Sequence, residues 1–158
     1  NHDERPTNSF LYSLVMDTYS FGYSSSGFTD MPMNHKVFLA QFDAIKKLAS
    51  EGPCVMVGRC ADYALSEYKD CFSVFVHADT DWRINRLSQK HNKTAKEAKD
   101  MINKTDKSRS SYYNYYTNKK WGAASSYNLC VDSSKLGIDG AAKAIIQAIE
   151  IFDSIKNK

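Results

Sequence analysis

Two stretches of the chain carry apolar residues at helical spacing. The first predicts a helix over residues 35–50, with Asn34 as its N-cap and Gly52 as its stop signal. The buried side of this helix would comprise Val37, Phe38, Phe42, Ile45, Leu48 and Ala49. The second stretch predicts a last helix after the cap residue Asp139. Its apolar side comprises Ala142, Ile145, Ile146, Ile149 and Phe152.

Three short apolar runs have the pattern of β-strands, namely residues 54–57, 71–76 and 129–132. The first is wholly apolar and lies between Gly52 and Gly58, which predicts a strand buried on both faces in the middle of a parallel sheet. Helices are expected over residues 61–67 and from Asp79 or Thr80 onward. This alternation of strands and helices predicts a parallel α/β sheet with right-handed crossovers.

Two further helices are predicted from local signals. The sequence from Thr94 to Glu97 is a capping box, which predicts that a helix begins at Thr94. This helix continues through the tyrosine-rich residues 112–116 and ends before Trp121. Residues 10–19 are apolar and aromatic, and we interpret them as another helix.

Length and composition limit the class of protein. The chain has 158 residues, of which 42% are hydrophobic and 25% charged, as in a single soluble domain. No apolar run reaches membrane-spanning length and the N-terminus has no signal-peptide character, so we expect a cytoplasmic protein without a membrane partner. The four cysteines show no metal-ligand spacing, which indicates reduced, mostly buried thiols and no metal site.

The positive charge is concentrated in one segment. The net charge is +3, and residues 93–120 hold eight Lys or Arg against three Asp or Glu. A local excess of this kind argues against a general nucleic-acid-binding surface. Arginines also follow the predicted strands, with Arg59 after the first and Arg83 and Arg86 on one helix face after the second. Transfer of a phosphoryl group needs several cations, because negative charge spreads over the group in the transition state.

The order of these motifs resembles the cytidylate kinase-like family, over residues 5–150 or so. The apolar run that ends in Gly58 and Arg59 is similar to the family's strand followed by Gly-Arg. The segment from residue 75 to Arg86 is similar to its next strand, acidic turn and helix with paired arginines.

Later segments extend the resemblance. The sequence Asp106-Lys-Ser-Arg109 matches the Asp-x-x-Arg of the family's lid, and residues 104–121 resemble the lid of its bacterial branch. Residues 131–138 resemble the family's last strand and the loop that closes over the nucleotide base. Each motif is short, and the joint order of the motifs carries the resemblance.

The resemblance implies a P-loop kinase fold, a three-layer α/β/α domain over residues 1–158 with a helical lid at about residues 94–121. It implies transfer of the γ-phosphoryl group of ATP to a pyrimidine nucleoside monophosphate, with Mg²⁺. The implied catalytic residues are Arg83, Lys104, Asp106 and Arg109, and the implied substrate-binding residues are Arg59, Asp62 and Arg86. Lys104 stands near the position of a lid arginine, and Asp62 lies two residues beyond Cys60, where the family has an acid.

The P-loop itself is the main departure from the family. Residues 22–29 have the glycine spacing of a P-loop, but Phe28 replaces the lysine that neutralises phosphate, so we interpret them as a flexible loop. In the family the first strand and P-loop precede the matching segments. We therefore expect phosphoryl transfer only when a P-loop lies upstream of Asn1.

Two alternatives remain open at this point. The first is a non-catalytic nucleotide-binding or interaction protein with a degenerate kinase fold, which the missing P-loop favours. The second is RNA binding by residues 104–121, in which tyrosines interleave with cations as in single-strand-binding surfaces. The same tyrosines also fit a helix that packs on a neighbour, and we prefer this simpler interpretation.

Overall fold

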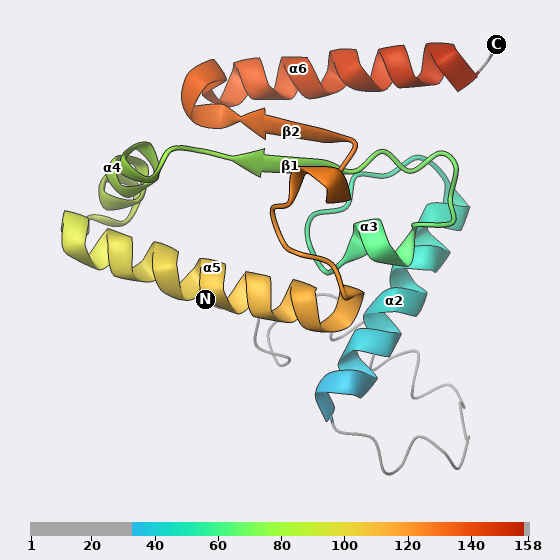
Figure 1. The fold of residues 1–158 in the computed structure, drawn as a ribbon, viewed down its shortest axis with the longest axis horizontal. Helices are drawn as coiled ribbons and strands as arrows, with labels where there is room; N and C mark the ends of the chain where they lie inside the picture. Colours follow the sequence, from blue (N-terminus) through green and yellow to red (C-terminus); the bar gives the residue numbers. More distant parts are fainter. Residues whose placement is uncertain (1–32, 157–158) are drawn as a thin grey trace. The chain divides into compact units, whose positions relative to one another are not determined.

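A computed structural model describes residues 33–156 (Figure 1). The chain divides into two compact units, an N-terminal unit of residues 1–69 and a C-terminal unit of residues 70–158. The predicted helix over residues 10–19 and the loop at residues 22–29 lie outside the described residues. The prediction of one domain over residues 1–158 stays a prediction, and each unit is described by itself.

The N-terminal unit contains helices α2 (Met33–Glu51) and α3 (Ala61–Ala64). Helix α2 confirms the predicted helix, but it begins one residue before Asn34, so the prediction that Asn34 is its N-cap is wrong. Ile45 is buried as predicted, whereas Leu48 is exposed. The two helices contact each other through Phe42 and Tyr63, whose ring centroids lie 6.2 Å apart in an edge-on arrangement.

Residues 54–57, predicted as a buried central strand, form no strand in the structure. Val55 is 95% exposed and Val57 is 90% exposed. A strand needs neighbouring strands that pair its backbone N–H and C=O groups, and no described strand pairs with this run. The prediction was wrong because an apolar run specifies strand propensity but not the partner that buries it. The helix predicted over residues 61–67 is also shorter, since α3 ends at Ala64.

The C-terminal unit is built on two parallel strands, β1 (Val74–His77) and β2 (Leu129–Asp132). Their register pairs Val74 with Leu129 and ends with His77 opposite Asp132, so the carboxyl ends of both strands meet. Strand β1 begins later than predicted, because Ser73 instead bonds the Asn128 side chain through its N–H and hydroxyl, each at 2.8 Å. The two strands confirm an α/β fold with parallel pairing, and the three-layer arrangement stays a prediction.

Helix α6 (Ser133–Lys156) lies along β2 (Figure 1). The ring centroids of Phe72 and Phe152 lie 5.1 Å apart and join the start of the unit to this helix. Asp139 was predicted as its N-cap, but the helix begins at Ser133 and is interrupted at Gly137, where φ is 69°. A left-handed φ is easy for glycine, so the chain bends there without strain. Three of its predicted apolar residues, Ala142, Ile146 and Ile149, are exposed.

Helices α4 (Thr80–His91) and α5 (Ala95–Thr117) form a helical hairpin beside the sheet (Figure 1). Helix α4 ends at Asn92, which is left-handed with φ 49°. Helix α5 begins at the predicted capping box and ends before Trp121, as predicted. The two helices pack through buried Ile84, Ala98 and Ile102, with Leu87 half-buried against them.

Two predictions about the whole chain can be compared with the described residues. No helix among residues 33–156 is both long and apolar enough to cross a membrane. All four cysteines are free, but only Cys60 is buried, whereas Cys54 is exposed and Cys71 and Cys130 are intermediate. The prediction of mostly buried thiols is therefore wrong, since Cys54 belongs to the exposed run that was expected to be a strand.

Candidate functional site

The first turn of α4 is fixed to the carboxyl edge of the sheet. The carboxylate of Asp79 caps α4 by accepting the N–H groups of Asp81 and Trp82 at 2.8 and 3.3 Å. The N–H of Asp79 donates to the Ser134 hydroxyl at 3.1 Å, and this hydroxyl donates to Asp132 at 2.5 Å. A chain of hydrogen bonds therefore joins the end of β2 to the start of α4.

The charge of Asp132 is favoured by the same hydrogen bonds. The Ser134 hydroxyl lowers the pKa of Asp132 below its ordinary value, and partial burial opposes this shift. The N–H of Ser134, 2.9 Å from the same carboxylate, and the nearby His77 act in the same direction. The resemblance drew attention to residues 131–138, but the link from Ser134 to Asp79 was not predicted. The sequence did contain a signal for this link: β1 and β2 are each closely followed by a helix start, and the ends of parallel strands lie at the same edge of a sheet.

The hairpin holds α5 against α4. At its turn, the Thr94 hydroxyl accepts the Glu97 N–H at 3.3 Å, and the Glu97 carboxylate accepts the Thr94 N–H at 2.8 Å. The Thr94 hydroxyl also donates to this carboxylate, at 2.8 Å. The two bonds that the Glu97 carboxylate accepts, from the Thr94 N–H and from the Thr94 hydroxyl, lower its pKa because they favour its charged form. Ala98, one residue further on, is fully buried at 0% exposure. The lack of a longer side chain there lets the two helix backbones approach closely.

The central feature of the candidate site is an ion pair across this hairpin, between Arg83 of α4 and Asp106 of α5. The two terminal nitrogens of the guanidinium, Nη1 and Nη2, donate to the two carboxylate oxygens at 2.7 and 2.8 Å. The side chains are 31% and 24% exposed, respectively. A pair this exposed contributes about 1 kcal/mol or less to stability. Its two-point geometry mainly fixes the orientation of the guanidinium.

The other three predicted site residues of the hairpin, Arg86, Lys104 and Arg109, lie around this ion pair in different positions. Arg86 lies over the ring of Trp82, with 5.5 Å from the guanidinium carbon to the ring centroid. Lys104 is exposed and lies two residues before Asp106, hence on a different face of α5. Arg109 is exposed and lies one turn beyond Asp106 on the same side.

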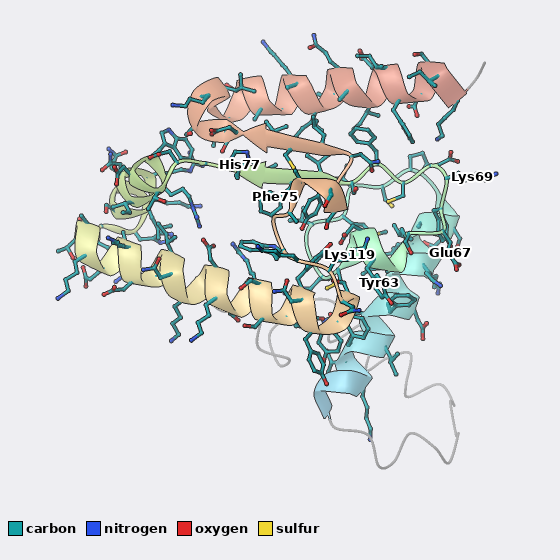
Figure 2. The ribbon with its side chains drawn as sticks, in the orientation of Figure 1. Tyr63, Glu67, Lys69, Phe75, His77 and Lys119 are labelled. Carbon is teal, nitrogen blue, oxygen red and sulfur yellow. The ribbon has the colours of Figure 1, made fainter. Side chains whose placement is uncertain are left out.

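The far end of α5 is anchored by aromatic rings. Phe75 extends from β1 toward the side on which α5 lies (Figure 2). Its ring centroid is 5.4 Å from that of Trp121 and 4.9 Å from that of Tyr127. Gly122 has φ 76°, and a Cβ there would lie 3.2 Å from the Phe75 ring, so glycine permits this close approach. The sheet, the hairpin and the aromatic anchor therefore hold α5 at both ends.

The predicted substrate-binding residues Arg59 and Asp62 belong to the N-terminal unit. Gly58, Arg59 and Cys60 have consecutive positive φ angles of 73°, 55° and 55°. Two non-glycine residues in this region carry backbone strain, which accumulates at functional sites. Asp62 lies in the first turn of α3, where the positive end of the helix favours a carboxylate.

Cys60 lies between these two residues and is 4% exposed. Burial raises the pKa of the Cys60 thiol to about 12, with a further increase from Asp62 and an opposing effect of Arg59. The thiol is therefore held in its protonated form at neutral pH, which makes it a weak nucleophile.

Metal ions in proteins are held by clusters of His, Cys, Asp or Glu side chains. Residues 33–156 contain no group of three or more His, Cys, Asp or Glu side chains that is arranged to hold a metal ion. Mg²⁺ needs only one or two carboxylates when nucleotide phosphates supply its other ligands.

Comparisons with known proteins place the chain among a group of relatives. The sequence model of the cytidylate kinase-like family matches residues 1–135. The crystal structure of an uncharacterized protein from Eubacterium ventriosum is similar to this chain, at 25% sequence identity, with 89% of each chain covered and a TM-score of 0.72. No curated protein matches the chain. The similarity to the solved structure concerns the fold, because that protein is uncharacterized.

Proposed function

Because the chain belongs to the cytidylate kinase-like family, we propose that it is a nucleotide kinase of the cytidylate type. The reaction transfers the γ-phosphoryl group of ATP to a pyrimidine nucleoside monophosphate. The observation that carries the proposal is the two-point pair of Arg83 and Asp106 across the hairpin. It holds a guanidinium in fixed orientation one turn into α4, whose start is bonded to the carboxyl edge of the parallel sheet. Ligands of open α/β sheets bind beyond this edge.

Each proposed residue has a role that follows from its chemistry. Arg83 and Arg109 offer planar forks to phosphate oxygens, and the fork contributes most when charge spreads over the transferring group. Lys104 contributes a point charge at the solvent side of α5, and Asp106 holds Arg83. Arg59 and Asp62 in the N-terminal unit, and Arg86 in the C-terminal unit, each stay a prediction as substrate-binding residues.

Magnesium belongs to the proposal as a companion of ATP. The ion neutralises phosphate charge when it is bound with the nucleotide. The chain's own residues do the rest: the arginines bind and orient phosphates, and α5, as part of the proposed lid, excludes water.

A kinase assay tests the proposal. ATP is supplied with CMP, UMP, AMP or GMP, and the formation of nucleoside diphosphate is measured for the protein as its gene encodes it. We expect turnover with a pyrimidine acceptor and a loss of at least about 100-fold for Arg83→Ala, since a donor to a developing charge contributes this much. Lys99→Ala is the matched control, because it removes one exposed charge from α5 outside the proposed site.

The outcomes separate the proposal from its alternative. Equal turnover rates for Arg83→Ala and Lys99→Ala would show that Arg83 has no role in phosphoryl transfer. Saturable nucleotide binding without turnover by the protein as encoded would instead support a non-catalytic nucleotide-binding protein. The exposure of Val55 and Val57 favours this alternative, because the strand they were expected to form leads to Arg59.

A further inference from the structure

The Arg83 guanidinium bonds its partner Asp106 through only two of its N–H groups. A guanidinium carries five N–H donors. The bonds to Asp106 leave from Nη1 and Nη2, so the carboxylate caps the end of the group and takes one hydrogen from each of these nitrogens. The side edge, formed by Nε–H and the second hydrogen of one Nη, has the spacing of a second fork. Among residues 33–156 no hydrogen-bond partner occupies that edge, and the side chain is 31% exposed.

Both partners of the pair are held in place from outside the pair. The N–H of Arg83 donates to the Asp79 carbonyl at 3.0 Å, so Arg83 sits in the first complete turn of α4, whose cap is bonded to Ser134. Asp106 lies one turn beyond Ile102 on the buried side of α5. The geometry of the pair is therefore set by the packed hairpin, and a ligand need not open it.

We propose that Asp106 is a positioning residue, which holds the Arg83 guanidinium by its end so that the side edge receives a phosphate group of the nucleotide. This inference rests on the proposed function and assigns one phosphate subsite to the face between α4 and α5. A fixed fork binds better than a mobile one, because its rotational freedom is lost before the ligand arrives. The gain outweighs the unfavourable charge of Asp106, since both carboxylate oxygens are occupied by Arg83.

A competing role for Asp106 gives the opposite sign. If its carboxylate occupied the place of the phosphate, removal of its charge would release Arg83 and strengthen anion binding. If it positions Arg83, removal of its charge weakens anion binding although α5 becomes more positive. The sign of a single substitution therefore separates the two roles.

The test measures binding of inorganic pyrophosphate to the 158-residue chain by titration calorimetry at fixed ionic strength. We expect Asp106→Asn to weaken binding about 5- to 20-fold, as expected when a charge-assisted hydrogen bond is misaligned. Asp100→Asn is the matched control, because it removes the same charge from an exposed position of α5. It should leave the affinity unchanged within about twofold or strengthen it slightly.

A second variant shows whether Asp106 acts through Arg83. Arg83→Lys keeps the charge but has no fork to orient, so adding Asp106→Asn to it should cause no further loss of pyrophosphate binding. Circular dichroism of each variant checks folding. Asp106→Glu, which keeps the charge and lengthens the side chain, should weaken binding less than Asp106→Asn and serves where Asp106→Asn does not fold.

Several results would overturn the inference. Stronger binding by Asp106→Asn would make Asp106 a competitor of phosphate. A full loss that persists in the Arg83→Lys background would mean that Asp106 touches the ligand itself. Absence of saturable pyrophosphate binding by the unaltered chain would show that the proposed phosphate subsite between α4 and α5 does not exist. None of these measurements needs phosphoryl transfer, so an inactive protein with the expected binding pattern would reject the proposed function alone.

Discussion

The α4–α5 hairpin and residues 54–60 show how differently local sequence signals can be realised. The hairpin contains a cap at Asp79 and a capping box at Thr94, which form where the sequence places them, and a left-handed stop at Asn92 that was not predicted. Residues 54–57 have an equally clear apolar pattern, yet they lie exposed and unpaired. A helix satisfies its backbone within a few residues, whereas a strand depends on partners far away in the chain. Local signals are therefore sufficient for the first region and insufficient for the second.

The largest expected effect concerns the two cysteines at the ends of the exposed run. Cys54 is exposed, whereas Cys60 is buried with a thiol pKa of about 12. At pH 8 a thiol with this pKa holds about a thousandfold less thiolate than an ordinary one of pKa about 8.5, and only thiolate is alkylated. We therefore expect iodoacetamide to modify Cys54 rapidly and Cys60 slowly, as measured by mass spectrometry of tryptic peptides.

Substitutions provide the control for this comparison. Cys54→Ser should remove the rapid phase of alkylation, and Cys60→Ser should leave it unchanged. Slow modification of Cys54 would show that residues 54–57 are buried in solution. Burial of this run is what the sequence-based prediction of a central strand requires.

The second effect compares side-chain packing in the same two regions. Ile102 is buried in the hairpin, so Ile102→Ala should lower the free energy of unfolding by about 2–4 kcal/mol. Val57 is 90% exposed, so Val57→Ala should change it by no more than about 0.5 kcal/mol. Urea unfolding followed by circular dichroism measures both. A loss of more than about 1.5 kcal/mol for Val57→Ala would mean that this side chain packs in a core.

The sequence could predict most elements but not the contacts that make the candidate site. The caps and apolar spacing located α2, α4 and α5, and the short apolar runs located β1 and β2 within a few residues. Arg83 and Asp106 were each chosen as site residues from the family resemblance. The two residues lie 23 positions apart along the chain, and whether they pair depends on how α4 and α5 pack. The Asp-x-x-Arg motif joined Asp106 to Arg109 on the same helix, because a short motif contains only neighbours within one element.

The smallest expected effect concerns pH and the link between β2 and α4. The pKa of Asp132 is lowered in the folded chain, mainly by the Ser134 hydroxyl. A carboxyl group with a lowered folded pKa stabilises the fold above its unfolded pKa, near 4, and this contribution is lost as the pH falls through the folded value. Ser134→Ala should therefore have a lower Tm than the unaltered chain at pH 7, and the gap should narrow between about pH 5 and pH 3.

Ser133 offers the matched control for this last effect, because its hydroxyl donates to the His77 carbonyl at 3.0 Å and involves no titrating oxygen. Ser133→Ala should lower the Tm by an amount that does not change between pH 7 and pH 3. The difference in Tm between Ser134→Ala and the unaltered chain should not vanish at low pH, since the Ser134 hydroxyl accepts the Asp79 N–H at every pH. A gap of constant size for Ser134→Ala would mean that Asp132 is not held in its charged form. The link from β2 to α4 would then be an ordinary neutral hydrogen bond, and the start of α4 would hold Arg83 equally well at every pH.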